Sequence, residues 1–234
     1  MGKEKLEKFY QELKRLEKGT VQRWNFGEAI ENLKTSQWPQ KGVYFFFDDT
    51  EAGLGDFPRI VRVGTVDIDE KPKKAKLRGR LKAHYGAKKN NGGNHRESSF
   101  RKHVGNAFIN SENLMNEYPE WDKGNKRPKK LAEKELPLEQ KVSKYIRNLG
   151  VVVLDIPDRD ARKYIESNAI GFLSALLPKF DSIDGDYLLK KSIKDEIKNS
   201  QLWNVDDVDY KYTDDFLDKL KHWVDYSIAE YKKA

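Results

Sequence analysis

The chain has 234 residues and a net charge of +7, and 35% of its residues are charged against 37% that are hydrophobic. This length suits one sizeable domain with extensions, and 12% of aromatic residues is too high for a disordered chain. The absence of cysteine excludes disulfides and thiolate zinc sites, and because there is no long apolar run or secretory signal we expect a soluble, cytoplasmic protein without a membrane partner.

One helix and two strands are predicted near the N-terminus. Leucine and phenylalanine recur at helical spacing from Lys3 to Lys18 and end at Gly19, which predicts an amphipathic helix. In "KGVYFFFDD" the run from Val43 to Phe47 predicts a buried strand, and "RIVRVGT" predicts a β-branched second strand. Eleven residues separate the two runs, so we expect a hairpin with a long loop.

The rest of the chain reads mostly as helices. "KLRGRLKAHYG" predicts a helix capped by Gly86, "AKKNNGGNH" a mobile loop, "SSFRKHVGNAFI" a short helix and "GNKRPKK" an exposed basic linker. Pro137 is expected to begin a helix that runs to Asn148. "VVVLDIP" predicts a third strand, and "DRDARKYIESNAIGFLSALL" a helix with an Asp at its N-terminus. The tail, around "SQLWNVDDV" and "DDFLDKLKHWVDYSIAEY", is expected to be helical and acidic.

Positive charge is concentrated in the middle of the chain. Residues 71–102 contain twelve Lys or Arg and a single acid, Glu97, whereas residues 181–234 contain thirteen acids and nine lysines. A polyanion would therefore approach the middle of the chain. The alternative is a solvated basic surface, but aromatic residues interleaved with the cations favour nucleic acid.

The residues expected to contact a nucleic-acid backbone fall into two groups. The first is four lysines of the basic segment: Lys73, Lys74, Lys88 and Lys89. The second, in "NHRESSFRKHVG", could form another phosphate-binding surface: His95, Arg96, Arg101 and His103. A histidine-rich zinc site is the less favoured alternative for this stretch, because the cationic neighbours would repel a metal.

Four short motifs occur in a characteristic order. "GVY" ends at Tyr44, "RVG" begins at Arg62, Arg80 and His84 follow one helical turn apart, and Glu166 lies in "YIESNAI". In this order and spacing the set resembles the GIY-YIG nuclease superfamily, over roughly residues 42–177. The flanking segments look like a prokaryotic branch of that superfamily.

The resemblance implies an α/β (α+β) fold, with a small three-stranded antiparallel sheet flanked by helices. We divide the chain into an N-terminal helical extension (1–40), a nuclease-like domain (41–180) with a basic insertion (86–135), and an acidic helical C-terminal extension (181–234). The resemblance also implies an enzyme that hydrolyses phosphodiester bonds with one divalent metal ion.

Candidate catalytic roles follow from the chemistry of each side chain. The strand-borne phenol of Tyr44 could hydrogen-bond an attacking water, although it needs a nearby cation to act as a base at neutral pH. The alternative for Tyr44 is a core tyrosine. Arg80 could clamp the scissile phosphate with paired donors, and His84 could relay a proton or bind phosphate. The alternative for these two is an exposed basic helix face.

Glu166 is the candidate metal ligand. A carboxylate in an otherwise apolar helix needs a partner, and a hard cation such as Mg²⁺, or Mn²⁺, is one. The matching position of the family binds the metal. A surface salt bridge with Arg162, four residues earlier, is the alternative.

The sequence departs from the family pattern at two places. Arg62 stands where the second motif usually has tyrosine. Strict alternation places Arg62 with Gly64 on one face of its strand and Val61 with Val63 on the other. If Arg62 faces Tyr44, its charge would favour the phenolate or hold phosphate. Many relatives also carry an asparagine late in the domain, and Asn204 is our candidate substitute.

Two functions remain open at this point. The first is a metal-dependent endonuclease of restriction or mobile-element type that acts on double-stranded DNA. The second is a nucleic-acid-binding module that keeps the fold with impaired catalysis. Retention of Tyr44, Arg80, His84 and Glu166 together favours the enzyme. A homodimer and a preference for RNA are left open by the sequence.

Overall fold

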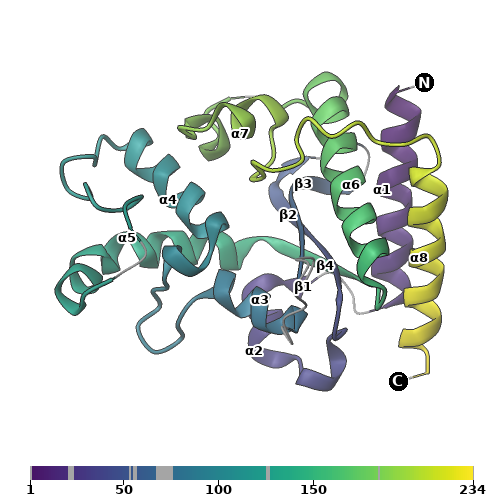
Figure 1. Cartoon of the computed structure of the whole chain (residues 1–234), viewed down its shortest axis with the longest axis horizontal. Helices are drawn as coiled ribbons and strands as arrows, with labels where there is room; N and C mark the ends of the chain where they lie inside the picture. The colour runs from purple at the N-terminus through teal and green to yellow at the C-terminus, as the bar shows by residue number, and fades with distance from the viewer. Residues whose placement is uncertain are drawn as a thin grey trace.

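A central antiparallel sheet lies between two groups of helices (Figure 1). The computed structural model describes residues 2–20, 24–52, 54, 57–66, 76–124, 127–183 and 185–233. The strands, in the spatial order β1-β4-β2-β3, are β1 (Trp24–Asn25), β4 (Gly150–Asp155), β2 (Gly42–Ala52) and β3 (Pro58–Thr65). The predicted three-stranded sheet is therefore confirmed, and the two-residue strand β1 extends it at one edge.

Strand β2 is the centre of the sheet. It pairs with β3 on one side and β4 on the other, and residues Val43 to Phe47 are all at most 1% exposed. Successive side chains of a strand point to opposite faces, so Val43, Phe45 and Phe47 enter one hydrophobic cluster while Tyr44 and Phe46 enter the other. A continuous apolar run is what a strand covered on both faces requires.

Three long helices cover the face that carries Phe45. They are α1 (Gly2–Gly19), α6 (Arg159–Phe180) and α8 (Phe216–Tyr231), seen together on one side of Figure 1. The apolar stripe of α1 that the sequence predicted is buried here, and Phe9 stacks on Phe172 of α6 with ring centroids 5.3 Å apart. Helices from both ends of the chain thus complete one hydrophobic core with the central strands.

Helices from the middle of the chain cover the face that carries Tyr44. They are α2 (Phe26–Asn32), α3 (Leu77–Tyr85), α4 (Ser99–Ser111), α5 (Lys129–Asn148) and the short α7 (Asp195–Ser200). Short 3₁₀ turns lie between elements of the chain: η1 (Thr35–Gln37) between α2 and β2, η2 (His95–Glu97) between α3 and α4, and η3 (Leu188–Lys191) between α6 and α7. Among the helices described, none is both long and apolar enough to cross a membrane.

Three predicted boundaries were wrong. Helix α5 begins at Lys129, and Pro137 lies inside it rather than at its start. Strand β2 continues to Ala52, which shortens the hairpin loop. The segment "SQLWNVDDV" is not helical beyond Ser200; instead the N–H of Trp203 donates to the carbonyl of Val61 at 2.7 Å, at the free edge of β3.

A β-bulge in β3 breaks the strict alternation that we expected. Phe46 pairs with Arg62 but Phe47 pairs with Ile60, so Val61 is an extra residue on this strand. As a result Val61 belongs to the cluster of Phe46, and of these two valines only Val63 reaches the opposite core. Alternation alone could not reveal the inserted residue.

The segment expected to be a mobile loop, residues 87–95, is tied to α5 by hydrogen bonds. Ser143 donates to the carbonyl of Gly92 at 2.9 Å, and Gln140 donates to that of Asn90 at 2.8 Å. Gly86 ends α3 with a φ of 85°, a conformation that glycine adopts at no steric cost. Backbone contacts with a neighbouring helix hold this glycine-rich stretch in place.

Candidate active site

Tyr44 and Gly64 form a cross-strand pair at the centre of the site. They are register partners on β2 and β3, and a Cβ atom added to Gly64 would lie 2.3 Å from the hydroxyl oxygen of Tyr44. Only glycine therefore leaves room for the tyrosine ring to cross β3. The tyrosine of the first motif and the glycine of the second depend on each other sterically.

A chain of hydrogen bonds runs from Tyr44 through His84 to Ser98. The hydroxyl of Tyr44 lies 2.8 Å from Nε2 of His84, and Nδ1 of His84 lies 2.8 Å from the hydroxyl of Ser98. All three residues are at most 1% exposed. The chain joins β2, α3 and the N-terminus of α4.

His84 is neutral at physiological pH. Burial lowers its pKa well below the ordinary value, and the charges of Arg62, Arg80 and Arg101 lower it further. A neutral imidazole has one donor and one acceptor nitrogen, so it can pass a hydrogen bond from one neighbour to the other.

Arg62 lies diagonally from Tyr44 rather than directly opposite it. Its register partner is Phe46, its guanidinium sits 4.8 Å from the ring centre of Phe100, and it donates a short hydrogen bond to the carbonyl of Trp203. Burial lowers the pKa of Arg62, whereas interaction with Tyr44 raises it. The two residues therefore interact electrostatically along the diagonal of the pair, and the expected effect of Arg62 on the chemistry of Tyr44 stays a prediction.

Glu166 reaches the edge of the sheet from α6. Burial raises the pKa of its carboxyl to about 7, and the nearby charge of Asp207 acts in the same direction. Arg62, Arg80 and the backbone N–H of Thr65 at the end of β3 act in the opposite direction. As a whole residue Glu166 is partly exposed, which places it at the border between the buried cluster and solvent.

Arg80 completes the arrangement from the solvent side. It is partly exposed on α3, one turn before His84, and its charge acts on Arg62, His84 and Glu166. The structure thus gathers the five candidate catalytic residues from β2, β3, α3 and α6.

Comparison with known proteins identifies the fold family. A model of the GIY-YIG domain family matches residues 1–229. The chain belongs to the GIY-YIG domain family. No curated protein and no solved structure matches the chain. Because the family is one of nucleases, membership indicates a phosphodiester hydrolase, and the resemblance found in the sequence is confirmed.

Glu166 is the candidate ligand for a divalent cation in this GIY-YIG domain. In the described part of the chain no group of three or more His, Asp or Glu side chains is arranged to hold a metal. One carboxylate with water and phosphate oxygens is nevertheless a normal shell for Mg²⁺. Burial opposes the negative charge of Glu166, and a cation would offset that penalty, so the residues present fit a single-carboxylate site. Arg162, the alternative partner, donates to the carbonyls of Ile156 and Pro157.

Much of the predicted second phosphate-binding surface is buried in ion pairs with α5. Arg101 is fully buried and donates to Glu139 at 3.0 Å, and Arg96 makes a two-pronged contact with Glu135. The N–H of His95 donates to Glu139 at 2.7 Å, while its ring stacks on a tryptophan. Burial alone would raise the pKa of Glu139, but the hydrogen bonds from His95 and the charge of Arg101 lower it to about 2. These contacts argue for a structural role of His95, Arg96 and Arg101.

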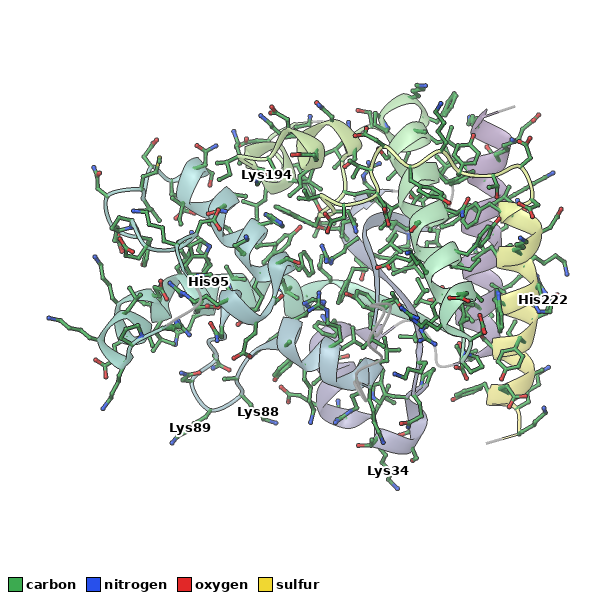
Figure 2. All side chains as sticks on the ribbon, viewed as in Figure 1. Lys34, Lys88, Lys89, His95, Lys194 and His222 are labelled. Carbon is green, nitrogen blue, oxygen red and sulfur yellow. The ribbon has the colours of Figure 1, made fainter. Side chains whose placement is uncertain are left out.

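The remaining predicted contacts are scattered. Asn204 accepts from the N–H of Val63 at 3.1 Å and donates to its carbonyl at 2.9 Å, so its amide serves the edge of β3. His103 is buried, and burial and the charge of Arg62 lower its pKa to about 4. Lys88 and Lys89 are exposed and point away from the body of the protein (Figure 2). Lys73 and Lys74 lie outside the described residues.

Sequence reasoning missed three residues that shape the site. They are Ser98, which contacts His84, Trp203, whose carbonyl accepts from Arg62, and Asp207, whose charge acts on Glu166. The serine before "SFRKH" is recognisable as a helix cap, but nothing in its spacing from His84 indicates a contact. The other two come from the C-terminal segment that we expected to be helical.

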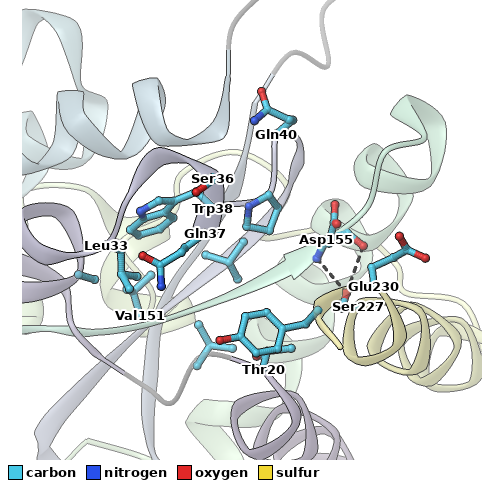
Figure 3. A pocket seen from close by; sticks show the side chains of 15 residues that line it. Thr20, Leu33, Ser36, Gln37, Trp38, Gln40, Val151, Asp155, Ser227 and Glu230 are labelled. Carbon is cyan, nitrogen blue, oxygen red and sulfur yellow. Dashed lines mark hydrogen bonds between the residues drawn. The ribbon is translucent and has the colours of Figure 1, made fainter. Parts of the chain in front are cut away.

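A separate cavity lies away from these residues. It measures about 770 Å³, and Figure 3 shows it between Trp38, Val151 and the C-terminal part of α8, where Ser227 is hydrogen-bonded to the backbone of Asp155. None of the five candidate catalytic residues lines it. The candidate active site is instead a buried cluster that opens to solvent at Arg80 and Glu166.

Proposed function

We propose that this GIY-YIG domain is a divalent-metal-dependent endonuclease that cleaves double-stranded DNA. The observation that carries the proposal is the hydrogen bond between Tyr44 and His84, 2.8 Å long, beside Arg62. A tyrosine that serves only to fill a core does not need a neutral histidine on one side and an arginine on the other.

Each residue has a chemical task in phosphodiester hydrolysis. Tyr44 would accept a proton from the attacking water, helped by the hydrogen bond to His84 and the charge of Arg62. Arg80, which is partly exposed, would bind the nonbridging oxygens of the scissile phosphate. Arg62 would stabilise the charge that develops on that phosphate.

Glu166 would hold Mg²⁺ or Mn²⁺ at the open side of the cluster. When bound, the metal ion would neutralise negative charge on the phosphate and help the leaving oxygen. Glu166 itself needs to be ionised for this task, and its pKa of about 7 places that ionisation near neutral pH. The N–H of Thr65 orients the carboxylate from the end of β3.

Binding of DNA would rely on exposed lysines. Lys88 and Lys89 lie at the tip of the loop after α3, and Lys88 is 3.0 Å from Glu31. Lysines of this kind contact phosphates without reading sequence, so they would add affinity but no specificity. Restriction or mobile-element cleavage stays a prediction, and the described surface gives no support to a homodimer.

One observation favours the alternative of a binding module with impaired catalysis. Tyr44 is 1% exposed, and Arg62 is occupied by the carbonyl of Trp203. A water molecule can reach the phenol only if this cover shifts when DNA binds.

Plasmid cleavage tests the proposal. Supercoiled plasmid is incubated with the protein and Mg²⁺ or Mn²⁺, with and without a chelator, and binding to a duplex is measured in parallel. We expect metal-dependent nicking or linearisation, lost in Tyr44→Phe and Glu166→Gln while duplex binding persists. Tyr210→Phe and Glu196→Gln, which change exposed residues, serve as matched controls and should cleave like the parent. Duplex binding by a parent that does not cleave would support the binding module instead.

A further inference from the structure

Ser98 is a buried residue whose side chain meets the candidate site through His84. Its hydroxyl oxygen lies 2.8 Å from Nδ1 of His84 and also accepts the backbone N–H of Arg101 at 3.2 Å. The second contact caps the N-terminus of α4. The first has no part in capping a helix, so it calls for another explanation.

The direction of each hydrogen bond follows from counting protons. Ser98, neutral His84 and Tyr44 bring one transferable proton each, but only two hydrogen bonds join them. While Tyr44 is un-ionised, one proton of the chain has no acceptor within it. Once the proton of Tyr44 has left, both bonds are complete, because Ser98 donates to Nδ1 and Nε2 donates to the oxygen of Tyr44.

The surroundings favour this direction over its reverse. Within the described part of the chain, Nδ1 of His84 is the one acceptor in reach of the Ser98 hydroxyl, since the Arg101 N–H uses the serine oxygen as an acceptor. Either direction leaves one buried hydroxyl without an acceptor, that of Ser98 in the reverse direction and that of Tyr44 in this one, and of the two only a phenol can lose its proton. Arg62, Arg80 and Arg101 are the charged groups that act on His84, and all three oppose a second proton on its ring.

We propose that Ser98 is a positioning residue that fixes His84 as the tautomer with its proton on Nε2, so that the Tyr44 oxygen stays a hydrogen-bond acceptor. This inference rests on the proposed function, in which Tyr44 receives the proton of the attacking water. The O–H bond of Tyr44 breaks beforehand, once the cover over the phenol has shifted on DNA binding; its electron pair stays on the oxygen, and its proton passes to a water molecule admitted by that shift. His84 donates to Tyr44 throughout and does not take this proton.

Nitrogen NMR of the full-length protein, labelled in its histidines, measures the tautomer directly and needs no DNA. The signals of His84 are assigned with a His84→Gln variant. We expect the parent to have a protonated Nε2 and a bare Nδ1. Ser98→Asp keeps an acceptor for the Arg101 N–H but has no proton to donate, so the proton of His84 should move to Nδ1. Ser99→Ala, at the exposed neighbouring serine, should leave the spectrum unchanged.

Cleavage assays of the same variants give the second measurement. Ser98→Ala and Ser98→Asp should each lose on the order of tenfold to a hundredfold in cleavage rate, the loss that is typical when a metal-binding histidine loses the partner of its other ring nitrogen. Ser99→Ala should cleave like the parent.

Each outcome decides the inference. A parent with its proton on Nδ1 overturns it, even if neither Ser98 variant folds. A Ser98→Asp variant that changes the tautomer yet cleaves at the parent rate overturns the positioning role and leaves the proposed function intact. If the tautomer behaves as expected but the parent does not cut DNA, the tautomer assignment stands and the proposed function fails.

Discussion

Replacing Glu166 with glutamine should stabilise the metal-free protein at alkaline pH. The carboxyl of Glu166 has an ordinary pKa of 4.5, which burial and Asp207 raise to about 7 in the folded protein. Between these two values the folded state holds a proton that the unfolded state has lost. The free energy of unfolding therefore falls as pH rises from 4.5 towards 7, and above pH 7 the full cost of burying the charged carboxylate applies.

The size of the effect follows from the same pKa. At 1.36 kcal/mol for each pKa unit, the difference between the ordinary and the folded-state pKa of Glu166 corresponds to roughly 3 kcal/mol in the free energy of unfolding. Glu166 is partly exposed, and water screens part of this penalty, so we expect about 1 to 3 kcal/mol. Glutamine resembles the protonated carboxyl, and it can still accept the N–H of Thr65.

Urea unfolding of parent and Glu166→Gln at pH 5 and pH 8 provides the assay. The two proteins should differ little at pH 5, and the variant should be the more stable at pH 8. Saturating Mg²⁺ should reduce this difference in stability at pH 8, because it binds and stabilises the folded parent. Glu196→Gln, an exposed acid on α7, is the control and should shift stability by less than about 0.5 kcal/mol at either pH. A variant that is destabilised equally at both pH values would show that Glu166 is a structural partner of the nearby arginines, and would refute a burial penalty on its charge.

Three further changes test other parts of the site. Gly64→Ala places a Cβ atom 2.3 Å from the Tyr44 oxygen. It should therefore abolish cleavage and lower the free energy of unfolding, measured in urea melts, by about 1 to 3 kcal/mol. A cleavage rate and a free energy of unfolding equal to those of the parent would mean that the ring does not cross β3. Arg62→Ala should slow single-turnover cleavage, because it removes the charge that acts beside Tyr44, while Arg62→Lys keeps a charge there and should be milder. A lysine variant as slow as the alanine variant would assign Arg62 to two-pronged phosphate binding instead. Alanine at Lys88 and Lys89 should reduce the salt dependence of DNA binding by about 0.9 in log–log slope for each phosphate that the protein no longer neutralises, and an unchanged slope would show that the two lysines face only solvent.

The sequence predicted well those elements whose pattern is local. The apolar run of β2 and the helical spacing in α1 each need only a few neighbouring residues to be recognised, and both elements are present. The order of the motifs placed Tyr44, His84 and Glu166 together because the family resemblance supplied the three-dimensional arrangement. Periodicity alone would have left these three residues on separate elements.

The failures involve partners that lie far away in the chain. Counting charges treated Arg101 as a surface cation, but its carboxylate partner, Glu139, lies 38 residues later and is also buried. The same ion pairs favour a helix through Pro137, because α5 must present Glu135 and Glu139 to the basic insertion. The bulge at Val61 was missed for a different reason: an inserted residue leaves no trace in a run of β-branched side chains.

The outer edge of β3 has implications for engineering a smaller nuclease. The outward backbone groups of Val61, Val63 and Thr65 are bonded to Trp203, Asn204 and Glu166 respectively. A protein truncated after Phe180 would keep the four short motifs but expose two of these three positions as an open strand edge. Unpaired edges of this kind recruit strands from other molecules, so such a fragment should aggregate although its motifs are complete. The C-terminal segment therefore protects the edge strand β3 from self-association. A shortened nuclease would need to retain this segment or carry a charged substitution on β3.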